Sequence, residues 1–281
     1  MGPAAPEPAP ACPPGDACRG GEWMTASLMY HDLVDPGGWD ASGFPGPSAA
    51  SYKFEWDEYE RQLRALSGTG LRFPRVDALD GEDDDACLLT FDDGGCSAVE
   101  AARRLEQHGM VGHFLVTGER IGTPGFLGAA DVRALAASGH VIGSHSHTHP
   151  PDISRLDARA LAAEWESSVS RLSQILGHAV DVASVPGGFH STLVARSAAR
   201  AGIRHLFTSE PTTSVARIDG CRIHGRYALQ RGATPELVAA LAVGRGGARA
   251  RQWLLWNLKK PAKRFVGPAY RWARRRAFGG A

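Results

Sequence analysis

Thr90-Phe91-Asp92-Asp93-Gly94-Gly95 stands at the end of an apolar run, Ala86 to Phe91, which the sequence predicts to be a buried strand. A second polar stretch, Gly143-Ser144-His145-Ser146-His147-Thr148-His149-Pro150, follows the predicted strand Val141 to Gly143. Carboxylate and imidazole side chains therefore come immediately after two strands. Parallel α/β sheets gather their reactive groups at the carboxyl ends of strands, so these two stretches favour such a sheet.

Predicted strands and helices alternate on both sides of these stretches. Further strands are expected over Ala26 to Leu33, Gly112 to Thr117, Val180 to Val185 and His205 to Thr208. Helices are expected over Trp56 to Leu66, Ser97 to His108, Asp131 to Ser138, Asp157 to Leu176, Leu193 to Ala201 and Thr234 to Val243. A capping box of Ser97 and Glu100 is predicted to start the second of these helices. The alternation predicts an α/β fold, either a parallel barrel or an open doubly wound sheet.

The composition is that of a folded domain. The chain has 281 residues, of which 43% are hydrophobic and 22% charged, and its net charge is +1. These values exclude global disorder, and the near-zero net charge argues against a dedicated nucleic-acid binder. The sequence contains no stretch of about 18 consecutive apolar residues, so we predict no transmembrane helix.

The first residues and the cysteines bear on the compartment. Residues 1–23 are rich in Pro, Ala and Gly and lack the basic start and apolar run of a secretory signal. We expect this segment to be a disordered leader, with a start at Met24 as the alternative, and we expect a cytoplasmic location. The cysteines are odd in number, without metal-site spacing, and are expected to be free thiols: Cys12, Cys18, Cys87, Cys96 and Cys221.

The last part of the chain is strongly basic. No Asp or Glu follows Glu236, whereas eleven Lys and Arg residues do, interleaved with aromatic and aliphatic side chains. Two interpretations of residues 245–281 stay open. The segment makes peripheral contact with an anionic membrane at its inner face, or it is a docked helix with a solvated basic face. Pro261 and Pro268 are expected to interrupt any long helix.

The two polar stretches carry the groups of a hydrolytic metal site. His145 and His149 are four residues apart, which places them on one face of a helical turn and is a common spacing of metal ligands. Two imidazoles and one carboxylate can hold a metal ion and leave positions open for water and substrate. The adjacent Asp92 and Asp93 could then divide the work, one as ligand and the other as general base.

Together these stretches resemble the polysaccharide deacetylases of carbohydrate esterase family 4, which share the NodB homology domain. Thr90 to Gly94 matches the first motif of that family, and His145-Ser146-x-x-His149 matches the second. The resemblance implies a distorted parallel (β/α) barrel of about seven strands. It places the deacetylase domain at residues 24–244, between the leader at 1–23 and a basic helical extension at 245–281.

The resemblance also implies roles for individual residues. Asp92 would be the general base, and Asp93, His145 and His149 would hold a divalent metal, usually zinc. The stretch that matches the third motif, Ser184-Val185-Pro186-Gly187-Gly188-Phe189-His190, lacks the usual Arg of that motif. Its Gly187 and Gly188 are expected to contact substrate.

The general acid has two candidates. The Leu-x-His motif that supplies the acid in this family is missing after Thr208, and His224 matches it poorly. His31, in Leu28-Met29-Tyr30-His31-Asp32, resembles the motif as it occurs in permuted members. A closed barrel brings its first and last strands together, so permutation can preserve the site. We predict that His31 is the acid; the alternative is a hydrogen-bonded histidine at a strand end.

The implied activity is that of a metal-dependent carbohydrate deacetylase, a hydrolase acting on carbon–nitrogen bonds other than peptide bonds. Its substrate would be an N-acetylated amino sugar of a glycan, a glycolipid or a polysaccharide precursor. Two alternatives remain: a carbohydrate O-acetyl esterase that uses the same site, and a catalytically silent glycan-binding protein.

Overall fold

The computed structural model describes residues 25–79 and 85–265, with side chains described up to residue 258. The expected leader at 1–23, two of the five cysteines and residues 266–281 lie outside this part of the chain. Within it, Cys87, Cys96 and Cys221 are free thiols.

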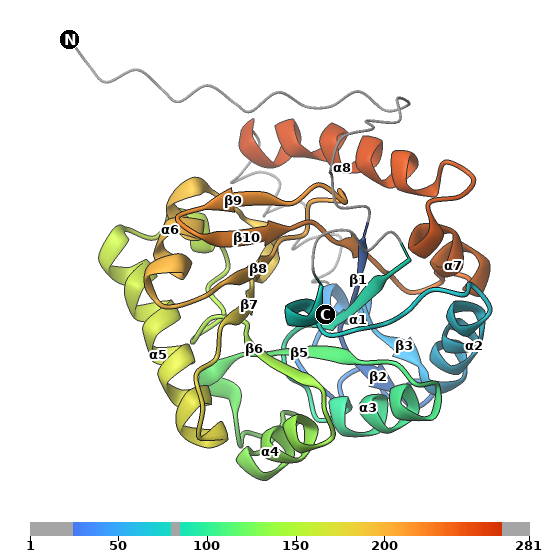
Figure 1. Cartoon of the computed structure of the whole chain (residues 1–281), viewed down its shortest axis with the longest axis horizontal. Helices are drawn as coiled ribbons and strands as arrows, with labels where there is room; N and C mark the ends of the chain where they lie inside the picture. The colour runs from blue at the N-terminus through green and yellow to red at the C-terminus, as the bar shows by residue number, and fades with distance from the viewer. Residues whose placement is uncertain (1–24, 80–84, 266–281) are drawn as a thin grey trace.

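A nine-stranded sheet forms the centre of the molecule (Figure 1). Its order is β11-β1-β4-β5-β6-β7-β8-β10-β9, and every pairing is parallel except that of β10 with β9. The strands are β1 Ala26–Tyr30, β4 Cys87–Phe91, β5 Gly112–Val116, β6 Val141–Ser144, β7 Val182–Ser184, β8 His205–Phe207, β9 Ala216–Ile218, β10 Cys221–His224 and β11 Tyr227–Ala228. A separate parallel pair consists of β2 Leu33–Val34 and β3 Phe54–Glu55.

One stretch of chain connects the two ends of this curled sheet. Strand β10 pairs with β8, and β11, which begins after Gly225 and Arg226, pairs with β1. Residues 221–228 therefore run from the neighbourhood of the sixth parallel strand to that of the first. The result is the distorted parallel barrel that the sequence predicted, with β9 added on its edge.

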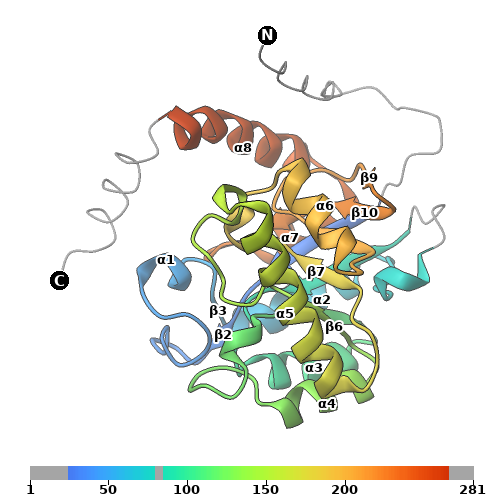
Figure 2. The ribbon, with the colours of Figure 1, turned by 90° about the vertical axis from the view of Figure 1, so that its left-hand side faces the viewer.

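Helices surround the sheet in both views (Figures 1 and 2). They are α1 Pro47–Ala50, α2 Trp56–Ser67, α3 Ala98–Gln107, α4 Ala129–Ala137, α5 Ala158–Leu176, α6 Thr192–Arg200, α7 Pro235–Val243 and α8 Ala248–Phe265. Short 3-10 helices are η1 Val76–Ala78, η2 Gly118–Arg120, η3 Ile153–Arg155 and η4 Pro186–Gly188. The helices α2 to α7 include all six that the sequence predicted, each within two residues of its expected ends.

Burial explains why the strands are apolar runs rather than alternating patterns. Every residue of β1, β4 and β5 is buried, because one sheet face lines the barrel and the other lies under helices. Aromatic rings add to the packing between strands. The ring of Phe91 stacks on Tyr30 at 5.3 Å and on Phe114 at 4.9 Å between centroids.

Two local predictions were wrong. Helix α8 continues through Pro261, which removes one backbone donor but does not end this helix. Ser97 does not cap α3. Its hydroxyl instead donates to Asp32 Oδ1 at 2.9 Å, and Glu100 pairs with Arg103 rather than with the helix start. None of the helices in the described part of the chain is long and apolar enough to cross a membrane.

Candidate active site

Three side chains from the two polar stretches converge beyond the ends of β4 and β6. Asp93 Oδ1 lies 3.4 Å from His145 Nε2 and 3.6 Å from His149 Nε2. One ligand atom from each of the three residues lies within 4.8 Å of the other two. Asp93 and His145 are buried, and His149 is partly exposed. Topology explains the convergence, since β4, β5 and β6 are parallel neighbours whose carboxyl ends share one edge.

This donor set fits a divalent metal. Ligands about 2.0–2.1 Å from a tetrahedral ion lie roughly 3.3 Å apart, which is close to the distances from Asp93 to the two imidazoles. The backbone is also bent to bring these groups together. Among the described residues, Asp93, Ser146 and His149 are three of the four non-glycine residues with positive φ, at 78°, 62° and 58°. Such conformations cost energy and gather where function requires them.

A hydrogen-bond chain sets the tautomer of His145. Its Nδ1 lies 2.6 Å from Ser184 Oγ, and the Ser184 hydroxyl donates to Asp92 Oδ1 at 3.0 Å. Because that hydroxyl proton is committed to Asp92, Ser184 must accept from His145, whose Nδ1 therefore carries the proton. The other ring nitrogen, Nε2, is left with a free lone pair that faces Asp93, as a metal ligand requires.

Asp92 is held by a buried arginine. Arg226 donates from Nη1 to Asp92 Oδ1 at 2.6 Å and from Nη2 to Oδ2 at 2.8 Å, and both side chains are almost fully buried. Further donations, from Nε to the Thr208 carbonyl and from Nη1 to Thr90 Oγ1, fix the guanidinium plane. Burial raises the pKa of Asp92, but the charge of Arg226 and the hydrogen bonds from its guanidinium outweigh that effect, so the pKa lies well below its usual range.

Arg226 is the main residue that the sequence analysis missed. The third-motif stretch lacks an arginine, and the structure supplies one from the junction between β10 and β11 instead. Those two strands are short and were not predicted, so no expectation placed Arg226 near the strand ends. Ser184, in contrast, lies in the third-motif stretch and reaches Asp92 from there.

Glu164 on α5 holds the second polar stretch in place. Its Oε2 accepts from the backbone N–H groups of His147 and Thr148, each at 2.9 Å, and its Oε1 accepts from Thr148 Oγ1 at 2.6 Å. The loop that carries His145 and His149 is thereby fixed to the helix behind it. His147 points away from the metal group, with its Nδ1 beside Gly118.

The two histidines considered for the general acid have different surroundings. His31 follows β1, and its ring lies tilted against that of Tyr52 with 4.8 Å between centroids. Its buried Nδ1 has no hydrogen-bond partner among the described residues. A positive charge on this ring would lower the pKa of both Asp92 and Asp93. His224 is hydrogen-bonded to His205, with 3.1 Å between the two ring nitrogens, and burial lowers the pKa of His224 to about 3.

Residues 35–53 form a wall beside the metal group. Phe44 contacts His149, with ring centroids 4.7 Å apart, and Tyr52 contacts His31. The wall is tied down by buried Lys53, whose ammonium donates to the carbonyls of Trp39, Ser42 and Phe44 at 2.6–2.7 Å. Two aromatic side chains are thus held in fixed positions next to the candidate catalytic groups.

Gly187 and Gly188 lie just beyond β7. Both have positive φ, at 64° and 70°, which favours glycine. A Cβ at Gly188 would also come within 3.0 Å of Ser209 Cβ and 3.1 Å of Trp256 Cη2. Backbone geometry and packing therefore account for both glycines, and contact with substrate stays a prediction.

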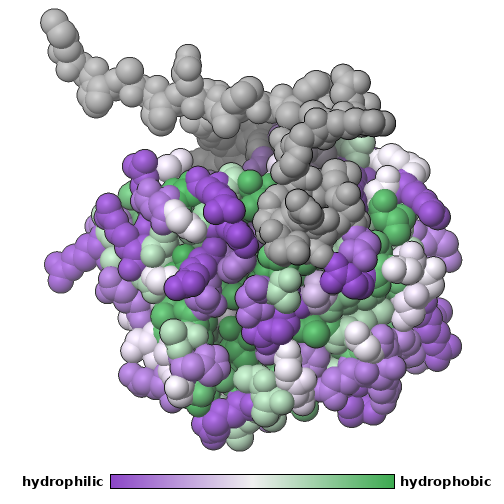
Figure 3. Space-filling view, in the orientation of Figure 1, coloured by the Kyte–Doolittle hydropathy of each residue, from purple (hydrophilic) through white to green (hydrophobic). Residues whose placement is uncertain are grey.

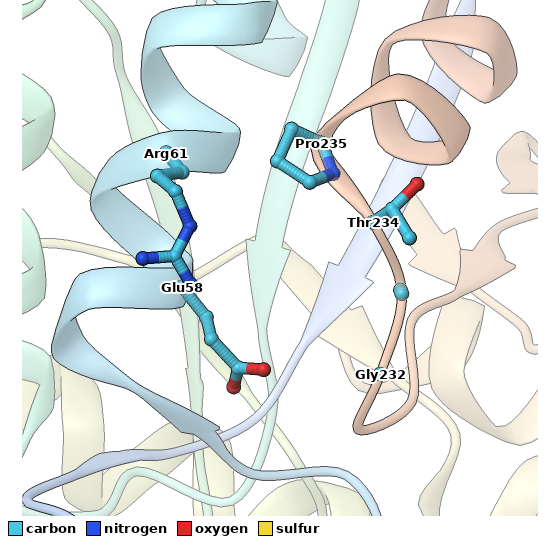
Figure 4. A pocket seen from close by; sticks show the side chains of 6 residues that line it. Glu58, Arg61, Gly232, Thr234 and Pro235 are labelled. Atoms are coloured by element: carbon cyan, nitrogen blue, oxygen red, sulfur yellow. The ribbon is translucent and has the colours of Figure 1, made fainter.

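A shallow groove elsewhere on the surface is unrelated to this site. It lies between α2 and the start of α7, has a volume of about 160 Å³, and is lined by Glu58, Arg61 and residues 232–235 (Figure 4). No member of the metal group or of the Asp92 network lines it. The candidate catalytic residues therefore lie at the strand ends and not in this groove.

Comparisons with known proteins identify a matching family and several similar folds. Residues 80–206 match the family described as polysaccharide deacetylase. The fold is similar to that of the Streptococcus pyogenes deacetylase PplD in complex with acetate, with 17% identity, a TM-score of 0.65 and coverage of 79% of this chain and 99% of that one. It is also similar to a polysaccharide deacetylase from Bacillus cereus, with 19% identity, a TM-score of 0.67 and coverage of 79% of this chain and 69% of that one. IcaB from Ammonifex degensii is similar as well, with 21% identity, a TM-score of 0.61 and coverage of 79% of this chain and 97% of that one. No curated protein gives a significant match.

Proposed function

We propose that this chain, which belongs to the polysaccharide deacetylase family, is a metal-dependent hydrolase that removes acetyl groups from N-acetylated amino sugars. The observation that carries the proposal is the juxtaposition of two groups. Asp93, His145 and His149 are arranged to hold a divalent metal, for which we propose zinc, and Asp92 is fixed beside them as an ionised carboxylate.

The residues would divide the work as follows. A divalent metal, when bound, supplies Lewis-acid activation at this position. Asp92 takes a proton from the attacking water as the water oxygen adds to the acetyl carbon. Arg226 and Ser184 occupy three acceptor positions on Asp92, and Oδ2 keeps a lone pair for that proton.

His31 completes the reaction in this proposal. As the carbon–nitrogen bond breaks, the imidazolium of His31 gives a proton to the leaving amine, and the products are acetate and a free amino sugar. The absence of a hydrogen-bond partner for Nδ1 in the described residues supports this role, because the ring is not committed to a structural bond. His224 is less suited, since it is buried and bonded to His205.

The test is acetate release from a panel of N-acetylated glycans, with metal content measured on the same sample. We expect release by the wild type and loss of release by Asp92→Asn with metal still bound. O-acetylated substrates form the control arm: faster release from these than from N-acetylated ones would identify an esterase. Undiminished release by Asp92→Asn would refute the role of Asp92, and no release by wild type would indicate a silent binding protein.

A further inference from the structure

Helix α8 is docked on the rim of the barrel by its polar side. Arg249 donates to the carbonyls of Leu241 and Ala242 at the end of α7, at 2.8 and 2.6 Å. One turn further on, Gln252 donates to the Ala228 carbonyl at the end of β11, at 2.7 Å. Polar residues of this helix are therefore committed to the body of the protein.

Further along the same side, Trp256 packs at the active-site edge. Its ring lies against Gly188, where a Cβ would approach Trp256 Cη2 to 3.1 Å. Gly188 is four residues beyond Ser184, which bonds to Asp92. Helix α8 thus follows the rim next to the candidate site, and both views place it along the outside of the sheet (Figures 1 and 2).

The opposite side of α8 carries three leucines that stay exposed in the described part of the chain, the reverse of an ordinary surface helix. Leu254, Leu255 and Leu258 are 53%, 44% and 65% exposed, and the i, i+4 spacing of Leu254 and Leu258 aligns them. Among the described residues, the other large hydrophobic side chains with such exposure are Val99 and Leu193, which lie singly on α3 and α6. Outside the grey atoms, the face shown in Figure 3 carries both hydrophilic and hydrophobic side chains.

Positive charge accompanies these leucines. Arg251 is exposed beside them, and α8 continues through Lys259, Lys260, Lys263 and Arg264. No acidic residue follows Glu236. An exposed leucine stripe on a helix without acidic residues is the composition of helices that lie in the interface of an anionic bilayer. A second copy of the chain would instead set one basic surface against another, which like-charge repulsion disfavours.

We propose that the leucine face of α8, formed by Leu254, Leu255 and Leu258, docks the protein onto an anionic lipid bilayer. The leucines enter the interfacial region, and Arg251 beside them contacts anionic headgroups. The opposite side of the helix stays on the barrel rim, so docking brings the edge of the candidate site close to the membrane surface. This proposal concerns binding alone and does not depend on the deacetylase chemistry.

The test is co-sedimentation of the full chain with phosphatidylglycerol-containing vesicles and with neutral phosphatidylcholine vesicles. We expect the wild type to prefer the anionic vesicles by about tenfold or more. Leu254→Asn/Leu258→Asn should weaken that binding by about tenfold or more, because two buried apolar contacts are lost. Leu193→Asn, which changes another exposed leucine (45% exposed) on α6, is the control and should bind as the wild type does. Arg251→Glu should also weaken the binding.

Two results would overturn the proposal. The first is equal vesicle binding by the wild type and by Leu254→Asn/Leu258→Asn, with both folded by circular dichroism. The second is a lipid-free dimer of the wild type, by light scattering, that the double substitution dissociates, since a second copy would then cover the face. The chemistry is separable: the double variant should release acetate from soluble substrate normally, and Asp92→Asn should still bind vesicles.

Discussion

Replacing Arg226 by methionine would remove the guanidinium that holds Asp92 while keeping much of its apolar volume. The two donations to the carboxylate, at 2.6 and 2.8 Å, would be lost. Ser184 would remain as a donor to Oδ1, so the carboxylate would keep one hydrogen bond but not its counter-charge. Both partners are buried, with side-chain exposures of 0% and 3%, so water cannot take the place of the arginine.

The expected cost is large for one interaction. Removing one partner of a buried ion pair costs about 3–5 kcal/mol, because the other charge stays buried without compensation. That is a sizeable part of the roughly 5–15 kcal/mol by which folded domains are stable. Replacing Asp92 by asparagine in the same protein would remove the unpaired charge. The double variant Arg226→Met/Asp92→Asn should therefore be about 2 kcal/mol or more stabler than additive costs predict.

Urea unfolding at pH 7 of the wild type, the two single variants and the double variant measures this directly. Additive costs, or a cost below about 1 kcal/mol for Arg226→Met, would refute the claim that the pair is a buried, coupled unit. Arg226→Lys covers the case in which the methionine variant does not fold. Lysine keeps the positive charge but cannot make the bidentate hydrogen bonds to Asp92, so kcat should fall by about tenfold or more with little change in KM.

The other predictions concern the acid, the buried histidines and the metal. His31→Ala should abolish acetate release yet bind metal as the wild type does, and unchanged turnover would remove His31 from the scheme. Burial lowers the pKa of His113 to about 4 and that of His224 to about 3. As the pH falls, the unfolded chain therefore protonates these histidines at a higher pH than the folded chain does. Chemical denaturation should therefore show full stability above about pH 6.5. Below it, each histidine should cost about 1.4 kcal/mol per pH unit, down to about pH 4 for His113 and about pH 3 for His224. His224→Gln should flatten that slope. Zinc at 100 times its dissociation constant should stabilise the wild type by about 2.7 kcal/mol and His149→Ala far less, as thermal melts with and without chelator would reveal.

Much of the fold could be predicted because most strands are short apolar runs with turn residues at their ends. The strands around Phe91, Phe114 and Ile142 are buried on both faces. Their continuous apolar runs therefore predict strands, although apolar and polar residues do not alternate along them. Residues 216–228 were not predicted as strands. Those three strands have two to four residues each, and β9 is largely exposed, so no apolar run marks them.

The site was predictable where the chemistry is local in sequence. Asp93, His145 and His149 lie in two motifs, and parallel topology explains why the motifs meet. Arg226 comes from 134 residues beyond Asp92, and a single arginine after a glycine carries no signal of that contact. Ser97 shows that a local pattern can also mislead. Its spacing to Glu100 suits a capping box, but its hydroxyl donates a hydrogen bond to the buried carboxylate of Asp32, which is distant in sequence.

The most direct test of the central claim is a titration of metal-free protein with zinc, followed by acetate release from an N-acetylated glycan. If Asp93, His145 and His149 form the catalytic metal site, activity should rise in proportion to added zinc and level off at about one equivalent per chain, and His149→Ala should stay inactive over the same range. Full acetate release by the metal-free protein, or an identical titration by His149→Ala, would contradict the account.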